Sequence, residues 1–187
     1  VGGTFKTVEA FDGSRAAAFS SYPNTVKGST AYTSTASEGS KALQIKYTFA
    51  ESTSTQAAYA NFSSPITFNG SPDKLTLSVN GNGTEQWLRG KITDSNGASY
   101  TIDFTKTLNW SGWKDVSASI PAGVSYPIRL ETIYVAALSN TNTSEQGVIF
   151  DNLRAVVADG NISTPSNTIF TDTQNVEIDN KVVGSYY

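Results

Sequence analysis

Residues 74–104 read KLTLSVNGNGTEQWLRGKITDSNGASYTIDF, a run of alternating apolar and polar residues interrupted twice by turn residues. Alternation with period two predicts half-buried β-strands. The alternating segments are Lys74–Val79, Gln86–Thr93 and Ser99–Phe104. Between them lie Asn80-Gly81-Asn82-Gly83 and Asp94-Ser95-Asn96-Gly97, residue types that tolerate the positive φ of tight hairpin turns. The stretch therefore predicts three strands joined by hairpins.

Similar segments recur along the rest of the chain, and helical periodicity is nowhere sustained. They lie at Thr4–Phe11, Ala42–Phe49, Ala57–Phe62, Lys114–Ile120, Arg129–Val135 and Val148–Val156. Together with the first three segments they make nine short strands, a pattern typical of a β-sandwich. We therefore predict an all-β fold, a β-sandwich of two antiparallel sheets.

The alternation also assigns each side chain to a face, since residues two apart share one side of a sheet. The predicted core side chains are Leu43, Ile45, Tyr47, Phe49, Leu75, Leu77, Val79, Leu88 and Ile92. The opposite side of the Gln86–Thr93 strand then carries Trp87, Arg89 and Lys91. An indole and two cations are costly to point outward without a ligand, so this side is a candidate binding surface.

Composition narrows the classes of function. The 187 residues include 13 basic and 16 acidic ones, and a net charge of −3 offers no field to attract a phosphate backbone, so nucleic acid is not an expected partner. Cysteine, histidine and methionine are absent, which removes disulfides and all thiolate or imidazole chemistry and leaves only oxygen ligands for a metal. No apolar run is long enough to span a membrane, so no membrane insertion is expected.

The chain is expected to hold one main domain, residues 1–157, followed by a linker and tail at 158–187. Ser163-Thr164-Pro165-Ser166-Asn167 has a linker composition. Beyond it, the short alternating patch Val176-Glu177-Ile178 fits either an extra strand of the sandwich or the start of a following domain. A sequence that opens at Val1 without a leader is expected to be a processed protein or an excised segment.

Three segments carry a resemblance to a known group of proteins. They are Val8-Glu9-Ala10-Phe11-Asp12-Gly13, Glu38-Gly39-Ser40-Lys41-Ala42-Leu43 and Val148-Ile149-Phe150-Asp151-Asn152-Leu153. In this order they resemble bacterial calcium-binding jelly-roll modules of the galactose-binding-like kind, which include many carbohydrate-binding modules. Trp87-Leu88-Arg89-Gly90, Trp110-Ser111-Gly112-Trp113-Lys114 and Ile133-Tyr134-Val135 resemble modules that accompany secreted glycosidases and surface-layer-anchored proteins. The resemblance implies a jelly-roll topology and an extracellular or cell-surface location.

The resemblance also implies a structural calcium ion (Ca2+). By position, its ligands would be the carboxylate of Glu9 or Asp12, the backbone carbonyls of Ser40 and Lys41, and the carboxylate of Asp151. Calcium accepts six to eight oxygen ligands from such a mixture. The alternative is that these acids are solvated residues at strand ends with no common ligand, and the choice between Glu9 and Asp12 stays open.

A carbohydrate site needs aromatic rings for the apolar C–H faces of a sugar and polar groups for its hydroxyls. Trp87, Arg89 and Lys91 fit this pattern, and neighbouring strands could add Tyr59, Asn61, Asp103, Glu131 and Tyr134. Other readings remain for several aromatics. Trp110 and Trp113 are expected to close the end of the sandwich, and Tyr47 and Tyr100 to pack in the core or across strands. Tyr134 shares its alternation with Leu130 and Leu138 and is expected to lean inward.

No enzymatic activity is expected. The Glu-x-Asp-x-x-Glu strand of jelly-roll glucanases is missing, because Val182 stands where the second Glu would follow Glu177 and Asp179. The predicted function is a non-catalytic carbohydrate-binding module that targets a larger secreted or cell-surface protein to a polysaccharide or oligosaccharide, with other domains of the same polypeptide as further partners. The alternative is a structural β-sandwich of a cell-surface or surface-layer protein without a sugar site.

Overall fold

The computed structural model describes residues 3–158, which form eleven β-strands and no helix. The strands are β1 (Gly3–Glu9), β2 (Ala17–Tyr22), β3 (Lys27–Thr33), β4 (Ala42–Thr48), β5 (Gln56–Thr67), β6 (Lys74–Asn82), β7 (Trp87–Thr93), β8 (Ser99–Thr105), β9 (Ser111–Ser119), β10 (Arg129–Ala137) and β11 (Gln146–Ala158). Accordingly, the described part of the chain offers no helix that could cross a membrane. The predicted linker and tail at 158–187 lie almost entirely outside the described residues.

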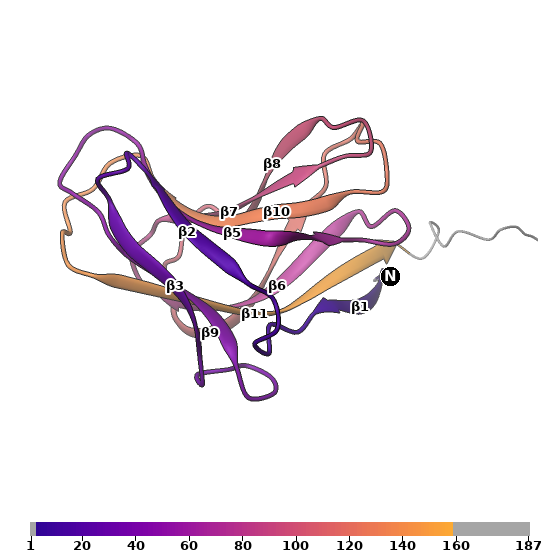
Figure 1. The fold of residues 1–187 in the computed structure, drawn as a ribbon, viewed down its shortest axis with the longest axis horizontal. Coiled ribbons are helices and arrows are strands. Elements are labelled where there is room, and N and C mark those ends of the chain that lie inside the picture. The colour runs from indigo at the N-terminus through magenta and orange to yellow at the C-terminus, as the bar shows by residue number, and fades with distance from the viewer. Residues whose placement is uncertain (1–2, 159–187) are drawn as a thin grey trace, which may run out of the picture. The chain divides into compact units, whose positions relative to one another are not determined.

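The strands form two antiparallel sheets stacked as a sandwich (Figure 1). One sheet has the order β3-β4-β11-β6-β9, with β1 added beside β11. The other has the order β2-β5-β10-β7-β8. Neighbouring strands are mostly far apart in sequence, as in a jelly roll, and the predicted fold class is therefore confirmed.

The core between the sheets is built from the apolar side of every central strand. All nine core side chains predicted from the alternation are buried. Aromatic rings fill the region beside β1, where Phe11 packs edge-on against Phe150 with ring centroids 5.3 Å apart and stacks on Phe62 at 5.9 Å. Phe11 has a left-handed backbone (φ 51°), which ends β1 at Glu9 and turns this ring into the core.

Two strands were missed by the sequence pattern. β2 and β3 each lie at one edge of a sheet, and both are rich in Ser, Thr and Ala with few large apolar residues. Only one side of an edge strand hydrogen-bonds to a neighbour, and neither strand contains the run of large alternating side chains that marks a central strand. The prediction of nine strands was therefore two short.

Of the two predicted hairpins, only the one between β7 and β8 is present, with its turn at Asp94–Gly97. The prediction of a hairpin between β6 and β7 was wrong, because these strands lie in different sheets and residues 80–82 continue β6. Gly83 and Gly97 have φ of 71° and 82°, a conformation that glycine adopts without strain. In the second turn the buried Asp94 carboxylate accepts hydrogen bonds from the backbone N–H groups of Asn96, Ala98 and Ser125. Those hydrogen bonds lower the pKa of Asp94 and tie the β7–β8 turn to the loop before β10.

Candidate functional site

The outer face of the β2-β5-β10-β7-β8 sheet carries side chains in cross-strand rows. The backbone register aligns Ser20, Tyr59, Tyr134, Arg89 and Asp103 in one row that crosses all five strands. A second row, two residues along each strand, holds Ala18, Asn61, Thr132, Lys91 and Thr101. A third row, two residues the other way, holds Tyr22, Ala57, Ala136 and Trp87. We call these three rows the tyrosine face.

Two tyrosines occupy the middle of this face. The rings of Tyr59 and Tyr134 lie 4.9 Å apart between centroids and are tilted by 41°, with both side chains half-buried. Burial raises the pKa of Tyr59, and the charges of Tyr134 and Tyr22 would raise it further. The Tyr59 hydroxyl is therefore a proton donor at neutral pH. The pair offers apolar ring surface next to groups that hydrogen-bond.

Arg89 is held beside the tyrosines by two neighbours. Its Nε donates to Asp103 Oδ1 at 2.6 Å, and its guanidinium carbon lies 4.7 Å from the ring centre of Trp87. Stacking on an indole and pairing with a carboxylate fix the plane of the guanidinium group. Since one nitrogen is used for Asp103, the remaining N–H groups are available to a ligand at a defined orientation.

A shallow hollow of about 330 Å³ lies beside the tyrosine pair. Its lining consists of Ser20, Tyr59, Asn61, Lys91, Thr101, Thr132 and Tyr134. The Asn61 amide is oriented by donating to Ser20 Oγ at 2.8 Å and by accepting from Thr132 Oγ1 at 3.1 Å. Hydroxyls, an oriented amide and an exposed ammonium group thus surround two aromatic rings. The residues that line the hollow come from all five strands of this sheet, whose arrangement Figure 1 shows.

The structure brings most of the predicted sugar-site residues together. Trp87, Arg89, Lys91, Tyr59, Asn61, Asp103 and Tyr134 all lie on the tyrosine face. Glu131 lies apart from the hollow, at the β10 bulge, where its carboxylate accepts from Arg129 Nε at 2.8 Å. Tyr22, which is 62% exposed, was missed because its strand was missed. The alternation of Ala17, Phe19 and Ser21 with exposed residues is the weak signal that would have revealed it.

The inward orientation expected for Tyr134 was wrong. The register of β10 shifts between Leu130 and Thr132, so Leu130 faces the core while Tyr134 faces outward. A β-bulge of this kind inserts one residue and reverses the faces beyond it. Leu138, expected to share its face, is exposed. Of the two tryptophans expected to close the sandwich end, Trp110 packs against the core, whereas Trp113 pairs with Asn80 on the other sheet.

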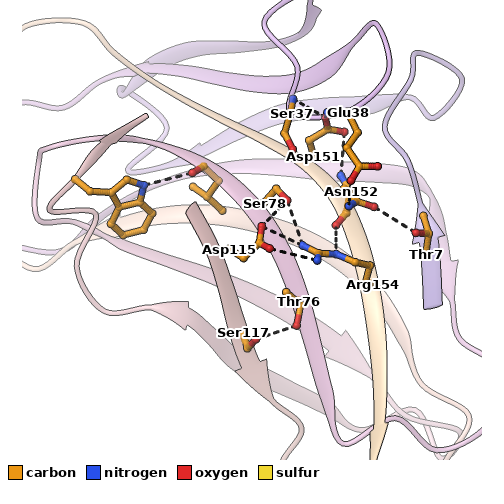
Figure 2. A network of polar contacts seen from close by, with 12 residues as sticks. Thr7, Ser37, Glu38, Thr76, Ser78, Asp115, Ser117, Asp151, Asn152 and Arg154 are labelled. Atoms are coloured by element: carbon orange, nitrogen blue, oxygen red, sulfur yellow. Dashed lines mark hydrogen bonds and ion pairs between the residues drawn. The ribbon is translucent and has the colours of Figure 1, made fainter. Parts of the chain in front are cut away.

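The predicted calcium ligands lie at the opposite sheet. The Asp151 carboxylate is fully buried and accepts hydrogen bonds from the backbone N–H groups of Ser37, Glu38 and Asn152, as Figure 2 shows. Burial raises the pKa of Asp151, and the negative charge of Glu38 adds to this rise. The Asn152 amide donates to Glu38 Oε2 at 3.1 Å, which holds the second carboxylate in place.

The two acids at the end of β1, Glu9 and Asp12, differ in their surroundings. Glu9 pairs with Arg15 Nε at 2.6 Å and accepts from the Phe11 N–H, while Asp12 is exposed. The Lys41 side chain passes close to Gly13, so the turn containing Ser40 and Lys41 lies against the β1–β2 loop. Between residues 3 and 158, no three acidic side chains come together in an arrangement that would by itself hold a metal ion. Calcium therefore stays a prediction.

Comparison with known proteins gives the fold. No family model and no curated protein sequence matches this chain. Among solved structures, the chain is similar to the family 11 carbohydrate-binding module of a cellulosomal cellulase of Clostridium thermocellum, with 14% identity, a TM-score of 0.51, and coverage of 84% of this chain and 97% of that one. A second structure, described as a carbohydrate-binding module of the β-sandwich superfamily, gives 12% identity and a TM-score of 0.58 over 79% of this chain and 60% of that one. At such identities the likeness establishes a shared jelly-roll β-sandwich.

Proposed function

We propose that this protein is a non-catalytic carbohydrate-binding module that uses the tyrosine face to attach a larger secreted or cell-surface protein to a polysaccharide. The observation that carries the proposal is the row in which Tyr59, Tyr134 and Arg89 lie side by side across three strands. Sugar rings stack their C–H faces on aromatic side chains, and fixed donors beside the rings take their hydroxyls. Such a module works by raising the local concentration of its partner at the polysaccharide.

The solved relatives support this proposal. A structure of the family 11 module holds a β-1,3-1,4-mixed-linked tetrasaccharide, at 14% identity to this chain and a TM-score of 0.51. The open tyrosine face suits a chain-like ligand better than a small molecule enclosed on all sides. Arg89 and Lys91 supply positive charge on this face, which favours a ligand rich in hydroxyls or itself anionic.

The acids of this sheet support binding rather than hydrolysis. A glycosidase needs two carboxyl groups that flank the sugar linkage, one of them as a proton donor. Asp103 pairs with Arg89 and Glu131 with Arg129, and neither acid lines the hollow beside the tyrosines. We therefore propose that the face binds its ligand without cleaving it.

Affinity electrophoresis tests the proposal. We expect the protein to be retarded in a gel containing at least one of cellulose, xylan, mixed-linked β-glucan or an anionic wall polysaccharide. Trp87→Ala is expected to lose roughly ten-fold in affinity, because it removes the ring on which Arg89 is stacked. Trp113→Ala, the same change on the other sheet, is the matched control and should migrate like the parent.

The outcomes separate the two candidate functions. If the parent migrates unchanged in every gel, the protein is a structural sandwich without a sugar site. If the parent is retarded and Trp87→Ala is retarded equally, binding does not use this end of the tyrosine face.

We further propose a structural calcium ion beside Asp151. The support is a buried carboxylate next to a second one, Glu38, while the four ion pairs within residues 3–158 all involve other acids. Two neighbouring anions are stabilised by a cation, and calcium accepts carboxylate and carbonyl oxygens as ligands. Backbone carbonyls, including those of Ser40 and Lys41, and water would complete the ligand set.

Removal of calcium with a chelator tests this proposal. A chelator is expected to lower the free energy of unfolding by about 3 kcal/mol relative to calcium at ~100 times its dissociation constant. Asp151→Ala removes an acceptor of three backbone N–H groups and is destabilised in any case, so the informative result is that its melting curve no longer responds to calcium. Glu145→Ala, an exposed acid in another loop, should keep the full response. Identical curves for the parent in chelator and in calcium would rule out the ion.

A further inference from the structure

A second hollow, larger than the one beside the tyrosines, lies where β7 begins and β10 ends in the same sheet. Its volume is about 460 Å³, and it is lined by the β6–β7 loop and the β10–β11 loop. Its lining consists of residues 83–87 and 136–142. Trp87 and Ala136 belong both to this lining and to the third row of the tyrosine face. The hollow is therefore continuous with the face on which we place the polysaccharide.

One buried side chain in the lining has an unused donor. Gln86 is only 8% exposed, and its Oε1 accepts a hydrogen bond from the Tyr47 hydroxyl. No partner for Gln86 Nε2 occurs among the residues that the structure describes. Buried polar groups without a partner are uncommon in folded proteins, and a ligand is one explanation for them.

The neighbouring hydrogen bonds fix which end of the Gln86 amide is free. Asn82 Oδ1 accepts from the Thr84 hydroxyl at 2.6 Å, which leaves Asn82 Nδ2 to donate to the Tyr47 hydroxyl at 2.9 Å. Burial raises the pKa of Tyr47 to about 12, so its hydroxyl keeps its proton and donates it to Gln86. A chain of donors thus ends on Gln86 Oε1 and leaves both N–H groups of Nε2 unused.

The two asparagine side chains in the lining hydrogen-bond within their own loop and to Ala50. Asn140 Nδ2 donates to the backbone carbonyls of Ala50 and Asn142, and Asn142 Oδ1 accepts from the backbone and hydroxyl of Ser144. These bonds shape the β10–β11 loop. Glu85 is the one charged residue in the lining; it is exposed and has a left-handed backbone (φ 62°), a conformation that concentrates at ligand sites in non-glycine residues.

We propose that this hollow is a second subsite for the same polysaccharide, in which a neutral sugar unit, a chain end or a branch, packs against Trp87 and receives a hydrogen bond from Gln86 Nε2. The inference rests on the proposed function, because the unit enters from a chain bound on the tyrosine face. The Glu85 carboxylate accepts hydrogen bonds from sugar hydroxyls at the rim of the hollow and repels sugars that carry a carboxylate. The subsite therefore selects for uncharged units at this end of the chain.

Two-dimensional amide and aromatic spectra of the full protein test the subsite. The probes are the mixed-linked tetrasaccharide, cellohexaose, xylohexaose and mannohexaose. The Gln86 side-chain amide signals are expected to shift with the same dissociation constant as the ring signals of Tyr59 and Tyr134. The parent protein alone decides this result, so it does not depend on the folding of any variant.

The binding affinity of the Gln86→Glu variant measures how much the Gln86 Nε2 donor contributes to binding. The carboxylate keeps an acceptor for the Tyr47 hydroxyl and removes the donor, and we expect about ten-fold weaker binding of whichever probe shifts the parent's signals. Gln44→Glu, the same change on the β3-β4-β11-β6-β9 sheet, should leave binding unchanged.

The outcomes distinguish the two proposals. Shifts of Tyr59 and Tyr134 without any shift of Gln86 overturn the subsite and leave the proposed function standing. A shift of Gln86 alone would place sugar in the second hollow but contradict binding on the tyrosine face, and it would overturn the continuous site proposed here. If no signal moves with any probe, both proposals fail.

Discussion

Replacing Tyr134 by alanine is expected to cost about 2 kcal/mol of binding free energy, which weakens binding of the retarding polysaccharide about 30-fold. Tyr134 stands at the centre of the tyrosine face, between Tyr59 on one side and Arg89 on the other. Its removal takes away one ring of the aromatic pair and leaves the Tyr59 ring without its neighbour at 4.9 Å. Isothermal titration calorimetry with a soluble form of the polysaccharide measures the loss.

Two further variants show whether the ring or the hydroxyl of Tyr134 causes the loss of affinity, and whether the loss is specific to the tyrosine face. Tyr134→Phe keeps the ring and removes the hydroxyl, so a loss of under about five-fold would assign most of the effect to stacking. Phe5→Ala removes an aromatic ring that is 60% exposed on β1 of the other sheet, and we expect it to bind like the parent. Equal affinities for Tyr134→Ala and the parent would show that the tyrosine pair does not contact the ligand.

Replacing Phe150 by alanine is expected to lower the free energy of unfolding by about 3–5 kcal/mol. Phe150 is fully buried on β11, the central strand of its sheet, and packs edge-on against Phe11. Small domains are stable by only about 5–15 kcal/mol, so this one change removes a large share of the total. Urea denaturation followed by circular dichroism gives the midpoint and slope.

Phe5→Ala is again the comparison, because it deletes the same side chain from an exposed position. We expect it to cost less than about 1 kcal/mol, including its contact with Arg154. A midpoint shift for Phe150→Ala no larger than that of Phe5→Ala would contradict the packing described for the core.

Central strands were predictable because burial on one side imposes a strict alternation. In β7, Leu88 and Ile92 are buried while Trp87, Arg89 and Lys91 face outward, as the pattern predicted. β10 shows the limit of this reasoning. Relative to β7, one inserted residue near Leu130 reverses the faces beyond it, and the sequence around the bulge contains no glycine or other local marker that would reveal it.

The second hollow could not be predicted from the sequence because its parts come from separate loops. Gln86 looked like the first residue of a strand, and its role depends on Tyr47, Asn82 and the β10–β11 loop. Likewise, the pairing of Glu9 with Arg15 depends on how the β1–β2 loop folds back, which alternation does not describe. Period-two patterns assign a side chain to a face, whereas the conformations of loops decide which polar groups meet.

The central claim is that polysaccharide covers the tyrosine face, and hydroxyl-radical footprinting tests it most directly. With a saturating amount of the polysaccharide that retards the protein, oxidation of Tyr59, Tyr134 and Trp87 is expected to slow several-fold, while Phe5 and Trp113 react at their original rates. Unchanged oxidation of the three face residues, or protection of Phe5 and Trp113 instead, would contradict the account.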